Sequence, residues 1–199
     1  LGYFSVLEAF GFINSTELLG FEKNGSNLFA HAHKDLSKGI EYSGGSLGLG
    51  VSFAVGVAIA NKLKKIESKV IVLVGDGECD EGIVWEALMS ASNYDLTNFM
   101  IIVDKNGMQS DGNKSKIMDQ KNLCEKLTAF GFCVEEVDGH NHIQISDALT
   151  RKSLLPRAIV ANTVKGKGIS FMENNADWHH GSLTQKQYDL AISELDNSV

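Results

Sequence analysis

The chain has 199 residues, a formal net charge of −7, and 43% hydrophobic against 22% charged residues. A chain of this length can bury a sizeable core, so residues 1–199 are expected to form a single domain. The acidic balance and the lack of a basic run argue against a nucleic-acid partner. The longest apolar stretch, around residues 51–60, is too short to cross a bilayer, and no signal peptide is visible, so no membrane partner is expected.

The three cysteines, Cys79, Cys124 and Cys133, are odd in number and lack the spacing of a metal site. We expect reduced thiols in a cytoplasmic protein, where they act as small buried hydrophobic residues.

The N-terminal part of the chain is predicted to be helical and then irregular. Hydrophobic spacing predicts helices at residues 3–12 and 15–21. Residues 22–46 are rich in Gly, Ser, Asn and His without periodicity, which predicts a long and therefore functional loop. Residues 47–65 are dense in Gly, Ala and Val and are expected to form a helix packed closely against its neighbours.

The rest of the chain alternates between short β-branched runs and helical spacing. Residues 69–74 and 98–104 are predicted to be buried strands, and the helix between them, residues 81–93, makes a βαβ unit with parallel strands. The same alternation then predicts helix 119–130, strand 132–137, helix 142–152, strand 155–163, a loop at 164–182 and a helix at 184–196 capped by Thr184. This order indicates an α/β fold, a doubly wound, mostly parallel sheet with helices on both faces.

Polar residues follow the first two predicted strands. Asp76 lies in the turn Gly75-Asp76-Gly77, and Asn106 follows the second strand. The carboxyl ends of neighbouring parallel strands meet at the edge where open α/β sheets bind ligands. One carboxylate and one carboxamide among glycines suit a hard cation that also holds phosphate oxygens. Ordinary turn residues are the alternative interpretation of both side chains.

The 30-position spacing of Asp76 and Asn106 resembles the thiamine diphosphate signature. The longer strings Gly-Asp-Gly-Glu-Cys-Asp-Glu-Gly-Ile-Val-Trp-Glu-Ala at 75–87 and Val-Asp-Lys-Asn-Gly-Met-Gln-Ser-Asp-Gly at 103–112 resemble the diphosphate-binding half of a transketolase. Similar stretches are the glycine-rich turn at 39–50, Asp-Gly-His at 138–140, and the loop 164–174 with Trp178-His179. The resemblance covers about residues 30–195.

The resemblance implies a thiamine diphosphate-binding domain of the diphosphate (PP) type that also holds Mg²⁺, with Ca²⁺ or Mn²⁺ as possible substitutes. Its metal ligands would be the side chains of Asp76 and Asn106 and the backbone carbonyl of Met108. Glycines would let the backbone approach the cofactor, and the helix starting near Leu47 would point its N-terminal amides at it; tight packing of small residues is the alternative. The expected cofactor-binding residues are Gly45, Ser46, Leu47, Gly75, Asp76, Gly77, Glu78, Asn106 and His179.

Three residues are expected to take part in catalysis by the same resemblance. His31 has the spacing of a family histidine, although Ala32 and His33 replace the Pro and acidic residue that follow it there. Such an imidazole would transfer a proton to or from the substrate oxygen, and a solvated loop histidine is the alternative. His179 matches a family histidine near the diphosphate and the substrate, and His180 stands where a glycine is usual.

Glu81 matches the family glutamate that meets its symmetry mate, or a partner chain, in a proton relay between two active sites. The alternative interpretation is favourable negative charge at a helix N-terminus.

The resemblance implies a transketolase, which transfers a two-carbon ketol unit from a ketose donor to an aldose acceptor, each a sugar or sugar phosphate. The pyrimidine-binding domain would lie on a separate C-terminal transketolase-like subunit, and homodimer contacts would complete a heterotetramer. Family members also carry an upstream segment, with a histidine facing the cofactor, that we expect to be missing from this sequence. The alternatives are a 1-deoxyxylulose-phosphate synthase-like enzyme, a 2-oxo acid dehydrogenase E1-like enzyme, and a non-catalytic cofactor-binding assembly subunit.

Overall fold

The computed structural model describes residues 1–197. The chain divides into two compact units, of which the first ends at Gly50 and the second begins at Val51.

The first unit is a small helical and loop structure. Helices α1 (Gly2–Ala9) and α2 (Ser15–Leu18) are followed by a 3-10 turn, η1 (Leu36–Lys38). Both helices are shorter than the sequence predicts, and the left-handed backbone at Gly11 (φ +77°) ends the first one because it cannot continue a helix. Otherwise residues 22–46 form a loop, as predicted. The core of this unit consists of Phe4, Leu7, Ile13, Leu28 and Ile40.

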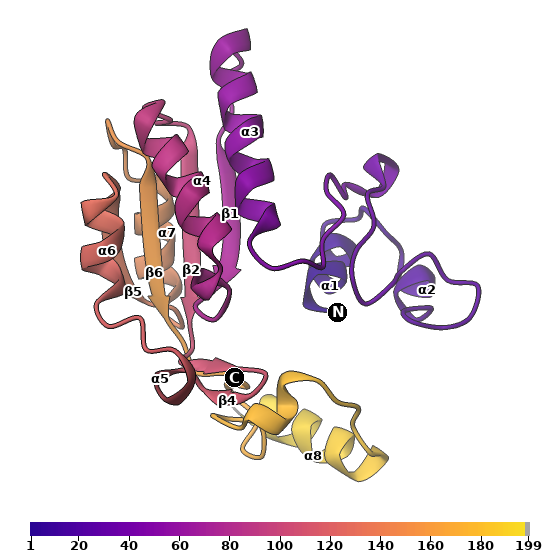
Figure 1. The fold of residues 1–199 in the computed structure, drawn as a ribbon. Coiled ribbons are helices and arrows are strands. Elements are labelled where there is room, and N and C mark those ends of the chain that lie inside the picture. Colours follow the sequence, from indigo (N-terminus) through magenta and orange to yellow (C-terminus); the bar gives the residue numbers. More distant parts are fainter. Residues whose placement is uncertain (198–199) are drawn as a thin grey trace. The chain divides into compact units, whose positions relative to one another are not determined.

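The second unit is built on a four-stranded sheet in the order β1-β2-β6-β5, with every pair parallel. Figure 1 shows the sheet with its helices. The strands are β1 (Val70–Gly75), β2 (Phe99–Lys105), β5 (Cys133–Asp138) and β6 (Arg157–Asn162). The helices are α3 (Leu49–Lys64), α4 (Gly82–Asn93), α6 (Leu123–Ala129) and α7 (His142–Thr150).

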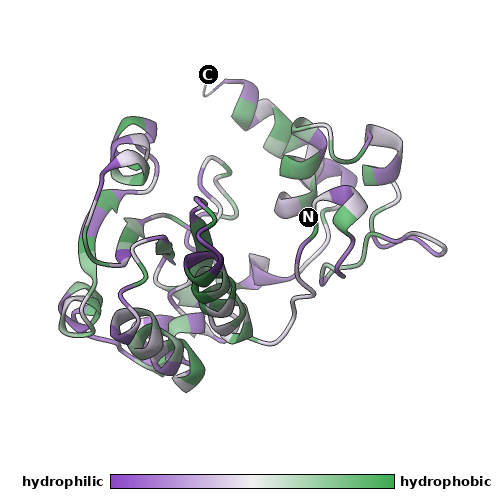
Figure 2. Cartoon of the chain, turned by 90° about the horizontal axis from the view of Figure 1, so that it is seen from above, coloured by the Kyte–Doolittle hydropathy of each residue, from purple (hydrophilic) through white to green (hydrophobic). Residues whose placement is uncertain are grey.

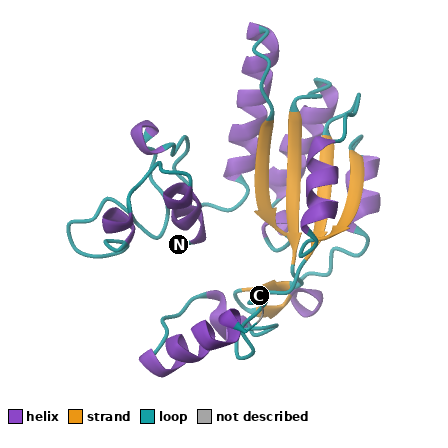
Figure 3. Cartoon of the chain, turned by 180° about the vertical axis from the view of Figure 1, so that it is seen from behind, coloured by secondary structure: helices purple, strands orange, loops and turns teal. Residues whose placement is uncertain are grey.

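Helices cover both faces of this sheet, which confirms the doubly wound α/β prediction. The main core joins α3, α4 and α6 to one face through residues such as Val51, Leu88 and Val103. On the other face α7 packs through Ala148 against Met100 and Ile159, and Figure 3 shows this side. Val103 and Met100 point to opposite faces because side chains alternate along a strand.

The segment after β2 differs from the predicted helix 119–130. It forms a hairpin of β3 (Met108–Gln109) and β4 (Gly112–Asn113), then a short helix α5 (Lys114–Ile117), and only then α6. The side chain of Asn122 caps α6, and the left-handed backbone at Lys121 (φ +55°) prevents an earlier start.

The C-terminal segment combines a loop with a helix, as predicted. The loop contains a 3-10 turn, η3 (Ala176–His179), and the chain then forms α8 (Gln185–Asp196). Thr184 caps α8 in a capping box with Gln187, which confirms the predicted cap. No helix of the described residues is long and apolar enough to cross a membrane. Figure 2 shows hydrophilic residues interrupting the hydrophobic ones along the helices.

Candidate cation and diphosphate site

Asp76 is buried at the carboxyl end of β1, where it joins the ends of two strands. Its backbone N–H donates to the carbonyl of Asp104 at 3.0 Å, and its Oδ2 accepts a hydrogen bond from the N–H of Gly107 at 3.0 Å. Its Oδ1 is buried and has no partner among the described residues. Burial raises the pKa of the Asp76 carboxyl, while the N–H groups of Gly107 and Gly77 and the charge of Lys114 act in the opposite direction.

Asn106 follows β2 and is held in one orientation. Its Nδ2 donates to Asp104 Oδ2 at 3.2 Å, and its Oδ1 accepts from the N–H of Met108 at 2.9 Å. Thr163, which follows β6, donates to the other carboxylate oxygen of Asp104. An amide oxygen has two lone pairs, so Asn106 Oδ1 keeps one acceptor position. Sequence reasoning missed the roles of Asp104 and Thr163, although Asp104 stands two residues before Asn106 at a strand end.

Met108 opens the β3–β4 hairpin directly after the Asn106 turn. Gly107 has a left-handed backbone (φ +70°), and its carbonyl accepts from the N–H of Lys114 at 2.9 Å, which closes the hairpin. The structure therefore brings the predicted ligands Asp76, Asn106 and Met108 to one edge of the sheet. A cavity of about 310 Å³ opens beside Asp76 and Asn106.

The donor set fits a hard cation. A buried carboxylate oxygen without a partner, an amide oxygen and a backbone carbonyl are the ligand types that Mg²⁺ and Ca²⁺ prefer. The described residues contain no cluster of three or more His, Cys, Asp or Glu side chains that could hold a metal ion.

The turn after β1 packs tightly against the hairpin. A Cβ on Gly77 would stand 3.1 Å from Cβ of Gln109, so the missing side chain lets the hairpin seat on this turn. Glu78 begins the 3-10 turn η2 (Glu78–Asp80), in which Cys79 is buried and its pKa is raised to about 12, chiefly by desolvation. The indole Nε1 of Trp85 donates to the Cys79 carbonyl at 2.9 Å.

The first unit brings His31 together with the glycine-rich turn. A Cβ on Gly45 (φ +134°) would stand 3.3 Å from Cδ2 of the His31 ring, so the imidazole lies against this glycine. Gly44 also donates its N–H to the carbonyl of Ala32 at 3.1 Å. His33 instead packs its ring on Phe29 with centroids 4.8 Å apart. Ser46 and Leu47 are exposed, and α3 begins at Leu49 rather than at the predicted Leu47.

His179 lies in η3, which packs against the β3–β4 hairpin. Burial lowers the pKa of His179, the positive charges of Lys165 and His180 lower it further, and Asp111 of the hairpin opposes them. His179 thus belongs to the same edge of the sheet as Met108.

Glu81 is the N-cap residue of α4, but its side chain makes no capping bond. The side chain is exposed and has no hydrogen bond or ion pair within the described part of the chain. This exposure leaves it available to another chain.

The Asp-Gly-His turn has a structural role. His140 Nε2 accepts the N–H of Val164 at 2.8 Å, and a Cβ on Gly139 would collide with the side chain of Thr163 at 2.4 Å. The turn therefore anchors the start of the C-terminal loop.

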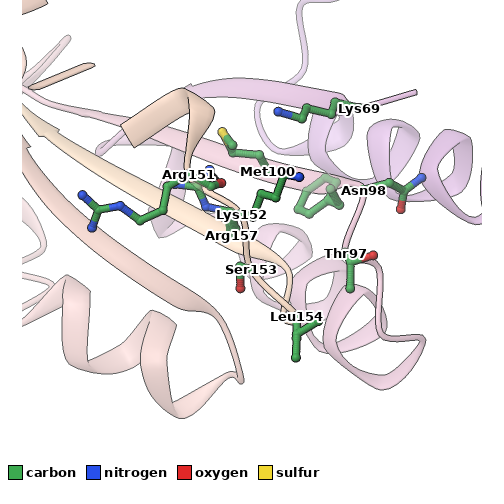
Figure 4. A pocket seen from close by; sticks show the side chains of 10 residues that line it. Lys69, Thr97, Asn98, Met100, Arg151, Lys152, Ser153, Leu154 and Arg157 are labelled. Atoms are coloured by element: carbon green, nitrogen blue, oxygen red, sulfur yellow. Dashed lines mark hydrogen bonds between the residues drawn. The ribbon is translucent and has the colours of Figure 1, made fainter. Parts of the chain in front are cut away.

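Another cavity, of about 410 Å³, lies at the opposite, amino-terminal edge of the sheet (Figure 4). None of the predicted site residues lines it. Its buried cation, Arg157, is already bonded to Glu135 and to the carbonyls of Ala148 and Arg151, which end α7.

Comparison with known proteins identifies the family of this chain. Residues 3–195 match the family model described as transketolase, thiamine diphosphate binding domain. The chain is 38% identical over 198 residues to one of the apulose-4-phosphate transketolase subunits of Phocaeicola vulgatus, covering 97% of this chain and 69% of that protein. It is also 38% identical over 175 residues to a 6-deoxy-6-sulfo-D-fructose transketolase subunit of a Clostridium species, covering 86% and 64%.

Solved structures show the same relation. The transketolase of Campylobacter jejuni superposes with a TM-score of 0.85 at 30% identity, covering 91% of this chain. The chain spans only 30% of the length of that enzyme. The matched residues and the shared parallel sheet together show that the chain belongs to the transketolase family and corresponds to its N-terminal, thiamine diphosphate-binding domain.

Proposed function

We propose that this chain is the diphosphate-binding subunit of a split transketolase, which transfers a two-carbon ketol unit from a ketose to an aldose. The observation that carries the proposal is the unpartnered, buried Oδ1 of Asp76 at the strand edge shared with Asn106. An isolated buried carboxylate oxygen is costly, and a divalent cation would satisfy it.

Asp76, Asn106 and the Met108 carbonyl would hold Mg²⁺, or Ca²⁺ or Mn²⁺ in its place, and the cation would hold the diphosphate. Bound thiamine diphosphate supplies the nucleophilic carbon that carries the ketol unit, and the protein positions and protects it. Phosphate contacts would come from the predicted glycine turns and their neighbours, namely Gly45, Ser46, Leu47, Gly75, Gly77, Glu78 and His179.

In this proposal the imidazoles of His31 and His179 transfer protons. His31 would give or take a proton at the substrate oxygen, with its ring steadied by contact with Gly45. His179 has a lowered pKa, so it is mostly neutral near pH 7 and can accept a proton there. Glu81, exposed at the start of α4, would meet its symmetry mate or a partner chain in a proton relay.

The partner would be a separate chain that carries the pyrimidine-binding domain. Two of the relatives above are named as transketolase subunits, which supports a divided enzyme. Two copies of each chain would form a heterotetramer. The three free cysteines support a reducing, cytoplasmic location within this proposal.

The donor would be a ketose with an anionic end. The relatives are named for apulose 4-phosphate and for 6-deoxy-6-sulfo-D-fructose, which carry a phosphate and a sulfonate respectively. Both names describe ketoses with an anionic group, so these two sugars and a plain ketose phosphate make the first panel of donors.

The proposal is tested by mixing the full-length protein with its separately purified partner chain and measuring ketol transfer from that panel. Transfer should require both chains, thiamine diphosphate and Mg²⁺. His31→Ala should lower turnover by about 10²-fold, and His33→Ala, whose ring packs on Phe29, serves as the matched control and should change it little. Full transfer by either chain in isolation, or a larger loss in His33→Ala than in His31→Ala, would contradict the proposal.

A further inference from the structure

Lys114 is a buried lysine with an unusual set of partners beside the site. Its side chain donates from Nζ to Asp80 Oδ1 at 2.5 Å and to the Met118 carbonyl at 3.2 Å. Gln120 donates from Nε2 to the same Asp80 oxygen at 2.6 Å. Lys114 is only 6% exposed, and lysines are rarely buried to this degree unless they are paired.

This lysine connects the two turns that carry the predicted cation ligands. Its backbone N–H closes the hairpin on Gly107, so it belongs to the turn after β2. Its partner Asp80 donates its own N–H to the carbonyl of Gly77 at 3.1 Å, so it belongs to the turn after β1. The ion pair therefore joins residues 34 positions apart in the chain.

Backbone pairing joins the same two turns on the side of the strands. Gly75 pairs with Asp104, and the N–H of Asp76 continues that ladder. Beyond the ends of the strands, the hydrogen bond from the Gly107 N–H to Asp76 Oδ2 joins the two turns on the ligand side, and the contact between Lys114 and Asp80 joins them farther from the strands.

We propose that Lys114 is a positioning residue of the cation and diphosphate site, which holds the Asn106–Met108 turn at its working distance from Asp76. The inference rests on the function proposed above. A small divalent cation demands closely defined ligand positions, so fixing the two turns in advance favours its binding.

The charge of Lys114 and its positioning role predict opposite changes in cation affinity when the lysine is removed. Lys114 acts on the Asp76 carboxylate as a nearby positive charge, and a positive charge repels a bound cation. Removing it should strengthen cation binding if charge were its only effect. Loss of positioning should weaken the same binding, so the direction of the change separates the two roles.

The test measures the affinity of the full-length protein for Mn²⁺ and thiamine diphosphate by calorimetry, with its partner chain present. Lys114→Met should weaken this affinity by about 10-fold or more, as is typical when a residue supporting metal ligands is lost. Arg157→Met breaks the comparable buried pair at the other edge of the sheet and should leave the affinity unchanged. The double variant Asp80→Leu/Lys114→Met removes both charges of the pair and should remain weak.

A second readout needs neither metal nor cofactor. Hydrogen exchange of the peptide spanning residues 105–118 should be faster in Lys114→Met than in the parent protein, and unchanged in Arg157→Met. Failure of the parent protein to bind thiamine diphosphate would refute the proposed function, while the exchange result would still decide whether Lys114 holds the turn. Unchanged exchange, stronger cation binding in Lys114→Met, or restored affinity in the double variant would each overturn the inference.

Discussion

The two edges of the sheet each contain a buried cation paired with a carboxylate. At the carboxyl edge, Lys114 pairs with Asp80 at 2.5 Å, and at the amino edge, Arg157 pairs with Glu135 at 2.5 Å. Each cation also bonds to backbone carbonyls that end a helix: Lys114 to Met118 after α5, and Arg157 to Ala148 and Arg151 in and after α7.

The surroundings distinguish the two pairs. Beside Lys114 lie glycine-containing turns and a buried carboxylate oxygen of Asp76 without a partner. At the amino edge Asn98 Oδ1 and Arg157 Nε also lack partners, but neither belongs to a carboxylate, and Glu135 accepts from two arginines, Arg151 at 2.8 Å and Arg157. A buried ion pair is therefore not by itself a sign of function. An unsatisfied carboxylate oxygen next to glycine backbone that can approach a ligand closely is the better sign.

The largest effect is expected from Asp76. Asp76→Ala should abolish Mg²⁺-dependent binding of thiamine diphosphate, measured by calorimetry, because it removes the only predicted carboxylate ligand. The cation-free variant should unfold at about the same temperature as the parent, because loss of the Gly107 hydrogen bond offsets the removal of a buried carboxylate without full pairing. Asp147→Ala, an exposed aspartate on α7, is the control and should change neither. Undiminished cofactor affinity in Asp76→Ala would remove the distinction between the two edges.

Substitution of Arg157 at the amino edge should change the free energy of unfolding but not cofactor affinity. Arg157→Met leaves the half-buried Glu135 with a single partner and frees the helix-ending carbonyls, so the free energy of unfolding should fall by about 3 kcal/mol. Denaturant unfolding measures this change, and cofactor affinity of the folded variant should match the parent. A loss of affinity at full stability would mean that the amino edge communicates with the site.

A smaller effect concerns His179, which packs on the hairpin of the carboxyl edge. Its pKa in the folded chain should lie below 6.5, and Lys165→Met should raise it while Asp111→Asn lowers it further. Because the folded state disfavours the charged ring, the unfolded state binds more protons, so stability falls as pH drops from 6.5 through the lower pKa of the folded state. Histidine resonances followed by NMR titration would show a midpoint at or above 6.5 if the burial argument were wrong.

The smallest expected effect is a difference in reactivity between the cysteines at the two edges of the sheet. Cys79 is buried in η2 with a pKa of about 12, whereas Cys133 begins β5 at the amino edge and is half-buried. Alkylation at pH 8, followed by mass spectrometry, should label Cys133 well before Cys79. Faster labelling of Cys79 would indicate that the turn after β1 opens readily, against the tight packing of Gly77 on Gln109.

The sequence allowed the strands and the ligand positions to be predicted, because β1 and β2 are short β-branched runs whose ends are marked by Gly75 and Asn106. It did not predict the hairpin and α5, because residues 107–122 lack periodicity. Contacts far along the chain shape that segment, such as Lys114 with Asp80, and Thr163 orients Asp104 across 59 positions. The assignment of metal and catalytic roles to these residues stays a prediction.

Tryptophan fluorescence can report on the predicted site, because the indole of Trp85 is hydrogen-bonded to the Cys79 carbonyl in the turn after β1. The chain has two tryptophans: Trp85 holds the turn after β1, and Trp178 lies in η3 beside His179 with its ring 5.2 Å from Phe171. Both indoles thus sit on segments that border the predicted site, and the Trp85 ring also packs on Phe130 with centroids 5.0 Å apart. The intrinsic tryptophan fluorescence of this protein should therefore report on order at the carboxyl edge without an added label or substrate.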